Sequence, residues 1–248
     1  MKIRRLHRWD VDYREAVAIQ RRLAAEVVEG PPLERVDVMA AADVSAGLAT
    51  ASPPGTAGVP WPDGRRAGRV DEWIAAAVVV VRLPAMDVLE VARASMRASW
   101  PYVPGCLSFR EAPVVLEAFR QLRTRPDVVL CDGQGRAHPR RFGLACHVGL
   151  ALDAPTIGCA KSLLAGEAAG PLGRRRGSRA DLVDAGERVG TVLRTRDAVR
   201  PVYVSVGHRI DLASAERWVL AAAARYRLPE PSRLAHQEVT AYKRELCV

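Results

Sequence analysis

The sequence predicts an α/β fold, a mixed β-sheet flanked by α-helices. In the first half of the chain, apolar runs typical of strands follow one another directly, and in the second half they alternate with segments of helical periodicity. Consecutive strands favour antiparallel hairpins, whereas strands separated by helices favour parallel pairing, so together they indicate a mixed sheet. With 248 residues, 49% of them hydrophobic, the chain can build one large core, and we expect a single domain over 1–248.

One helix and three strands are predicted in the first half. Residues 12–29 carry apolar side chains at helical spacing, and the sequence Gly-Pro-Pro at 30–32 ends the pattern. Apolar segments that suit strands lie at 36–45, 74–83 and 88–94. Their order predicts an antiparallel start to the sheet.

Strands and helices alternate in the second half. We expect helices at 114–122 and 142–152, and strands at 128–131, 156–160, 188–195 and 201–206. Asp211 is a candidate N-cap for a further helix, because an apolar stripe at helical spacing runs from Leu212 to Tyr226. This half is the part of the chain that favours parallel pairing.

Two segments rich in Pro, Gly and Arg, at about 48–70 and 166–181, are predicted to be mobile loops. The second contains the basic run Arg174–Arg176. Such a run is either a solvated loop or an arm that contacts phosphate groups. The formal net charge of +9 favours a polyanionic partner such as a nucleic acid.

The cysteines and the hydropathy pattern indicate a cytoplasmic protein. None of the five cysteines forms a C-x-x-C pair, and Cys131, Cys146 and Cys159 lie in apolar stretches, so we expect small buried side chains in a reducing compartment. The longest apolar run, Ile74–Val81, is far shorter than the roughly 20 residues that span a bilayer. No membrane partner is expected.

Three carboxylates occupy positions where an acid is unfavourable or conspicuous: Asp43 inside a predicted strand, Glu111 before a predicted helix, and Asp132 at the end of a strand. A buried carboxylate costs several kcal/mol unless it is paired or binds a cation. Acids that converge from different strands make the oxygen-rich site that Mg²⁺ prefers.

Each acid also has a simpler interpretation. Asp43 can lie on a solvated face of its strand. Glu111 can close a capping box that begins at Ser108, although Pro113 suits the first helical position better and places Glu111 just before the helix. Asp132, followed by Gly133, can make an Asx turn.

The stretch WPYVPG stiffens the loop around Tyr102, because prolines stand on both sides of this residue. A rigid aromatic ring beside a duplex can fill the gap left by an extruded base. Alternatively, Tyr102 packs on the core. His138 and His236 can orient water or bind phosphate. Lys161 directly follows a strand and can reach a developing negative charge. Alternatively, each of these three residues is an ordinary surface side chain.

Taken together, several stretches resemble the endonuclease V family. They are, in chain order, LHRWD, ADVS, PYVPGCLSFRE, RPDVVLCDGQGRAHPRRFGLACHVGL, PTIGCAKSLL, VSVGHRIDL and YRLPEPSRLAHQ, between residues 6 and 237. Each is weak alone, but their order and spacing make the resemblance specific. It implies a ribonuclease H-like fold and a Mg²⁺-dependent nuclease, with Mn²⁺ as an alternative metal, that recognises hypoxanthine in nucleic acid.

The resemblance further implies cleavage of the second phosphodiester bond on the 3′ side of the lesion, with 3′-hydroxyl and 5′-phosphate ends. The acidic metal-binding cluster of the family falls on Asp43, Glu111 and Asp132. Its C-terminal catalytic histidine falls on His236, and its active-site lysine falls on Lys161. The expected substrate is inosine-containing DNA in the repair of deaminated adenine.

Substrate-binding positions also carry over by resemblance. The histidine after the Asp-Gly-Gln-Gly turn is His138. The strand-separating wedge falls on Pro101, Tyr102, Val103 and Pro104. Backbone around the wedge and the glycine turn implies a base pocket at Gly105, Leu107, Gly133 and Leu144. Cleavage chiefly of inosine-containing RNA and inosine binding without catalysis stay open as alternatives, and we expect a monomer.

Overall fold

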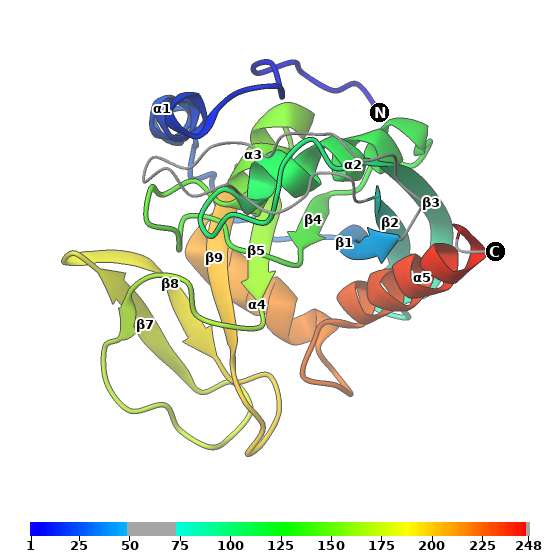
Figure 1. Cartoon of the computed structure of the whole chain (residues 1–248). Coiled ribbons are helices and arrows are strands. Elements are labelled where there is room, and N and C mark those ends of the chain that lie inside the picture. The colour runs from blue at the N-terminus through cyan, green and yellow to red at the C-terminus, as the bar shows by residue number, and fades with distance from the viewer. Residues whose placement is uncertain (49–72, 247–248) are drawn as a thin grey trace.

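The computed structural model describes residues 1–48 and 73–246. The predicted loop at 48–70 therefore lies, apart from residue 48, outside the described residues. Within the described ranges, the strands form one mixed sheet in the order β3-β2-β1-β4-β5-β9-β8-β7-β6 (Figure 1). The strands are β1 (Val38–Leu48), β2 (Trp73–Arg82), β3 (Asp87–Arg97), β4 (Val128–Cys131), β5 (Thr156–Ala160), β6 (Glu167–Ala168), β7 (Arg179–Asp184), β8 (Glu187–Leu193) and β9 (Val202–His208).

The pairing confirms the predicted mixed sheet. β1, β2 and β3 form an antiparallel meander, and β1, β4 and β5 pair in parallel. β9 returns antiparallel to β5, and the strands β8, β7 and β6 extend that edge. Helices between the parallel strands supply the crossovers, as the alternating pattern of the second half indicated.

Helices cover both faces of this sheet (Figure 1). On one face lie α2 (Leu107–Gln121) and α3 (Leu144–Leu152), and α1 (Tyr13–Ala24) packs against α3 through a cluster that includes Leu23, Phe142 and Leu150. The other face carries α4 (Leu212–Ala222) and α5 (Glu230–Leu246). None of the helices within the described ranges combines the length and apolar character needed to cross a bilayer.

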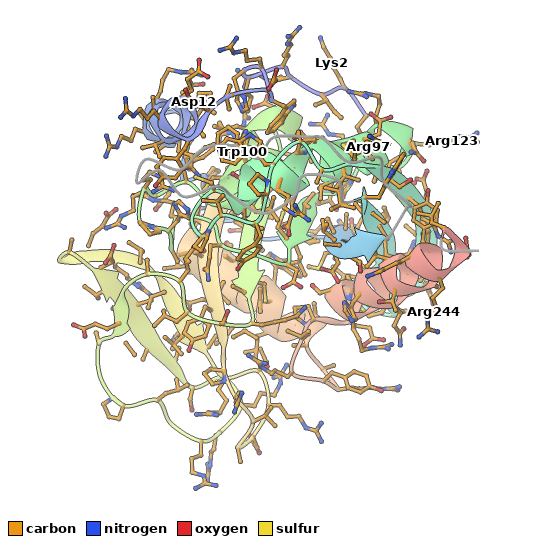
Figure 2. All side chains as sticks on the ribbon, viewed as in Figure 1. Lys2, Asp12, Arg97, Trp100, Arg123 and Arg244 are labelled. Carbon is orange, nitrogen blue, oxygen red and sulfur yellow. The ribbon has the colours of Figure 1, made fainter. Side chains whose placement is uncertain are left out.

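Two hydrophobic layers follow from the alternation of side chains along the strands. In β1, Ala40 and Ala42 pack in the layer that contains α2 and α3, whereas Met39 and Ala41 pack in the layer that contains α4. The central strands are buried on both faces, and β2 is accordingly a continuous apolar run. The helices that cover the sheet carry charged side chains on their outer side, as Arg244 of α5 shows (Figure 2).

Element ends differ from the predictions for identifiable reasons. α1 begins as expected, with Asp12 and Glu15 forming a capping box, but it ends at Ala24 rather than near residue 29. α2 begins at Leu107, seven residues before the predicted start, with Pro113 inside the helix rather than at its first position. The capping box of Ser108 and Glu111 is therefore absent, because both residues already lie within the helix.

The structure also contains elements that the sequence pattern did not reveal. Part of the segment at 166–181 pairs as β6 and as the first residues of β7. The C-terminal helix α5 was not predicted as an element, although it carries His236. Asp211 caps α4 as predicted, since its side chain accepts a hydrogen bond from the Ser214 amide.

Buried cysteines yield a first testable prediction. Cys131, Cys146 and Cys159 are buried in the core, as predicted, and Cys106 is buried too, while Cys247 lies outside the described residues. Burial raises the pKa of Cys146 and Cys159 to about 12 and also raises that of Cys106 and Cys131. At pH 8, we therefore expect four of the five thiols to resist Ellman's reagent in the folded protein.

The control is the same titration in guanidinium chloride, where all five thiols should react. Rapid reaction of two or more thiols in the folded protein would contradict this packing.

Candidate active site

The parallel register of β1 and β4 brings two carboxylates together. Ala42 is paired with Cys131, so the next residues, Asp43 and Asp132, lie side by side. The Asp132 amide continues the ladder by donating to the Ala42 carbonyl at 3.3 Å. Asp43 is only 7% exposed, so its solvated-face interpretation is wrong.

Glu111 reaches the same place from α2. Burial, together with repulsion from Asp43 and Asp132, raises the pKa of Glu111 to about 8. The charges of Arg110 and Lys161 oppose this shift of the pKa without cancelling it. The three carboxylates therefore disfavour one another's ionised forms, as expected for acids that share a small site.

Two cationic or polar groups moderate this repulsion. The Lys161 ammonium, directly after β5, forms an ion pair with Asp132 Oδ2. His236 on α5 places Nδ1 at 2.7 Å from Asp43 Oδ2, and the His236 side chain is 60% exposed. Burial and the Asp43 charge raise the pKa of Asp132, whereas Lys161 opposes that shift. All five residues of the predicted catalytic set thus meet at one end of the central strands.

The donor set matches a hard divalent cation in its chemistry, since it offers three carboxylates and no thiolate. Among residues 1–48 and 73–246, however, no three acidic, histidine or cysteine side chains are already gathered around one point as metal ligands. Lys161 and His236 hold two of the carboxylates in their present positions. A cation would therefore bring Asp43, Glu111 and Asp132 closer together on binding, because the coordination site is not preformed.

A cavity of about 360 Å³ opens beside these acids. Asp132 and its ion-pair partner Lys161 belong to its lining, so the cavity adjoins the carboxylate cluster. Every residue of the predicted base pocket lines it, and so do Tyr102 and His138. The complete lining is Tyr102, Pro104, Gly105, Leu107, Ser108, Asp132, Gly133, Gln134, His138, Gly143, Leu144, Ala160, Lys161, Ser162, Leu163 and Leu164.

The loop before α2 presents an aromatic ring at the mouth of this cavity. Tyr102 is 68% exposed, whereas its neighbours Pro101 and Val103 are buried, so the alternative that Tyr102 packs on the core is wrong. Val103 packs with Trp100, whose ring centroid lies 5.4 Å from that of Phe109 of α2. The loop is thus anchored on both sides of its exposed ring.

A tight turn follows the ring. The Cys106 amide donates to the Val103 carbonyl at 2.9 Å, with Pro104 and Gly105 at the centre of the turn. Gly105 has φ = +76°, as the third residue of a type II turn requires. A side chain at Gly105 would also meet the Arg140 guanidinium at 2.8 Å.

His138 is committed to the protein's own backbone. Its Nδ1 accepts from the Arg140 amide at 3.1 Å, so its Nε2 carries the proton and donates to the Gly105 carbonyl at 2.9 Å. Burial and the nearby Arg140 charge lower the pKa of His138 to about 4, so the ring is neutral at pH 7. It lines the cavity, but neither nitrogen is left over for a ligand.

Two further residues of this region were missed by sequence reasoning. Gln20 and Arg140 both donate to the Gly105 carbonyl, and Gln20 is 1% exposed in α1. A glutamine on the apolar face of a predicted amphipathic helix was the one signal present. The basic run Arg174–Arg176 lies between β6 and β7, is exposed, and does not line the cavity.

Sequence comparisons with known proteins point to one family. The family model described as Endonuclease V matches residues 64–237. Endonuclease V of Gloeobacter violaceus is 45% identical over 231 residues, which cover 93% of this chain and 86% of that protein.

Solved structures show the same fold. The crystal structure of endonuclease V from Streptomyces avermitilis superposes with a TM-score of 0.82 at 37% identity and covers 100% of both chains. A structure of Ciona intestinalis endonuclease V, in complex with a 24mer DNA containing an inosine followed by a ribo-adenosine, has a TM-score of 0.75 at 23% identity and covers 94% of this chain and 98% of that one.

The family match spans more than half of the chain, and the relatives align over nearly its whole length. The mixed sheet flanked by helices is the fold that this chain shares with these structures. The chain therefore belongs to the endonuclease V family of nucleases, which hydrolyse phosphodiester bonds.

Proposed function

We propose that this protein is a Mg²⁺-dependent endonuclease that recognises hypoxanthine in DNA and hydrolyses the second phosphodiester bond on its 3′ side, leaving 3′-hydroxyl and 5′-phosphate ends. One observation carries the proposal: Asp132 of the carboxylate cluster and its ion-pair partner Lys161 also line a cavity that has an exposed aromatic ring at its mouth. A nuclease that reads a base and cuts nearby requires this adjacency. The inosine-containing DNA in the Ciona intestinalis complex supports the choice of lesion.

Asp43, Glu111 and Asp132 would hold the metal. A bound Mg²⁺ would stabilise the negative charge that develops on the attacked phosphate and would lower the pKa of an attacking water. Mn²⁺ accepts the same oxygen ligands, so we expect it to substitute. Because the carboxylates repel one another when no cation is present, a divalent ion satisfies all three at once.

His236 and Lys161 act beside the acids. The contact with Asp43 fixes the His236 ring through Nδ1, and its high exposure leaves the other ring nitrogen free to align a water for in-line attack. The Lys161 side chain is 40% exposed at the cavity edge, where its ammonium can pair with a phosphate of the substrate strand. Both roles are proposed from position and chemistry.

The cavity would hold the extruded base. Gly105, Leu107, Gly133 and Leu144 line it, and we propose that their main-chain polar groups read the edge of hypoxanthine. Gly133 matters most, because a side chain there would lie 3.3 Å from Leu144 and would narrow the space between them. The exposed Tyr102 ring would fill the gap that the base leaves in the duplex.

The metal role is tested by changing Asp43 to asparagine. Loss of one charged ligand should reduce the single-turnover cleavage rate of an inosine-containing duplex by roughly 10³-fold. Binding of the lesion duplex, measured by fluorescence anisotropy, should stay within about threefold of the original. Asp37→Asn is the matched control, because Asp37 is an exposed aspartate just before the same strand and lies outside the site.

Unchanged turnover in Asp43→Asn, or an equal loss in both variants, would contradict the metal role.

The wedge role is tested by changing Tyr102 to alanine. Removing the ring should weaken binding of an inosine-containing duplex about tenfold while changing binding of the same single strand much less, because only a duplex has a gap to fill. Both affinities are measured by anisotropy titration. Tyr226→Ala is the control, since Tyr226 is also exposed but contacts Arg233 away from the cavity.

Equal losses on duplex and single strand in Tyr102→Ala would rule out a wedge.

A further inference from the structure

One backbone carbonyl between the wedge loop and the cavity receives an unusual number of hydrogen bonds. The Gly105 oxygen accepts from Gln20 Nε2 at 2.9 Å, from His138 Nε2 at 2.9 Å, and from the Arg140 guanidinium. A carbonyl has two lone pairs, and one of these three donors is charged. These three hydrogen bonds hold the Gly105 peptide more firmly than the single hydrogen bond of an ordinary turn would.

The three donors come from two separate parts of the fold. Gln20 belongs to α1, whereas His138 and Arg140 belong to the segment between β4 and α3. That segment also supplies Gly133 and His138 to the lining of the cavity, whereas the loop before α2 supplies Tyr102, Pro104 and Gly105. The bonds from His138 and Arg140 therefore join two segments that line the cavity.

Gln20 completes the connection with every atom of its amide. Its Nε2 also donates to the Phe142 carbonyl at 3.2 Å, and its Oε1 accepts from Arg140 Nε at 2.6 Å. Gln20 is fully buried, and buried polar networks are rigid when all their members are satisfied. One polar cluster thus connects α1, the turn at Gly105 and the segment between β4 and α3.

We propose that Gln20, His138 and Arg140 form a clasp on the Gly105 carbonyl that sets the distance between the Tyr102 wedge and the base cavity. They are positioning residues for lesion recognition, and this inference rests on the proposed function. None of them contacts the carboxylates of Asp43, Glu111 or Asp132 within the described residues. The clasp therefore governs how well an extruded base is held, and the hydrolytic step proceeds independently of it.

The clasp matters because the Tyr102 ring makes few contacts of its own. Tyr102 is largely exposed, so its position follows from the turn at Val103–Cys106 rather than from contacts of its own. That turn depends on Gly105, whose positive φ leaves the peptide free to pivot when its carbonyl is released. A released carbonyl would therefore let the turn, and the Tyr102 ring with it, adopt several positions, and ordering the loop on binding would cost affinity.

Arg140→Met tests the clasp, and Arg141→Met is its matched control. Arg141 is the next residue, and it pairs with Asp184 and Glu187 on the β7–β8 hairpin without touching Gly105. Single-turnover cleavage of an inosine-containing duplex is measured across enzyme concentrations. For Arg140→Met, the half-saturating concentration should rise about tenfold, equivalent to about 1.4 kcal/mol, while the rate at saturation stays within about twofold.

A spectroscopic readout separates positioning from general destabilisation. With 2-aminopurine next to the inosine, its fluorescence rises when the neighbouring base leaves the stack. At the enzyme concentration that half-saturates the original protein, Arg140→Met should show less of this rise than the original protein and Arg141→Met. Arg140→Lys should restore most of it, because an ammonium can still donate to the Gly105 carbonyl.

Gln20→Glu is the second variant in case Arg140→Met does not fold. It removes the Nε2 donor to Gly105 while keeping the size of the side chain and an acceptor for Arg140. The clasp is refuted if folded variants keep the original half-saturating concentration and fluorescence, or if they lose only the rate at saturation. Failure of the unchanged protein to cut inosine-containing strands would instead refute the proposed function, so the two failures are distinguishable.

Discussion

The mutual repulsion of three carboxylates is the constraint on which this molecule depends. Parallel pairing of β1 with β4 forces Asp43 and Asp132 into adjacent positions, and α2 adds Glu111 to the same poorly solvated place. Such a cluster is tolerated if one member takes up a proton or if cations compensate the charge. Lys161 and His236 compensate part of the negative charge, and a divalent metal would compensate the rest. A metal bound there would also lie where the proposed cleavage takes place. The unfavourable interaction is thus the reason the site can bind a metal.

Recognition and chemistry are built on the same turn. Asp132 ends β4 as a member of the carboxylate cluster, and the next residues form a wall of the cavity. The sheet fixes this turn from below, because its glycines pack directly on neighbouring strands: a side chain at Gly135 would lie 2.1 Å from the Val206 carbonyl. The cavity is also lined by a surface loop with an exposed ring, which is fixed by the packing of Val103 on Trp100 and by the polar contacts on the Gly105 carbonyl. A rigid sheet and a clasped loop together define one recognition site.

Sequence reasoning succeeded where physical constraints are local. Buried strands such as β4 and β5 were predicted with their observed bounds, since each is a short apolar run closed by a polar or glycine-rich turn. The start of α2 was wrong because Pro113 has a strong positional preference that the fold overrides. The catalytic set and the pocket residues came from family resemblance, and the structure brings them together around one cavity. Gln20 and Arg140 were beyond reach, because their partner Gly105 is 85 and 35 residues away and no local pattern encodes such contacts.

Mapping the cut on labelled strands tests the central claim most directly. Matched DNA and RNA strands, each with one inosine, are incubated with the protein in Mg²⁺ or in EDTA and resolved on a denaturing gel. The account predicts Mg²⁺-dependent cleavage of the DNA at the second phosphodiester bond 3′ to the inosine, and no cleavage of the matched adenosine strand. Cleavage in EDTA, cutting without regard to the inosine, or tight binding with no cut would contradict it, and preferential cutting of the RNA would move the substrate assignment from DNA to RNA.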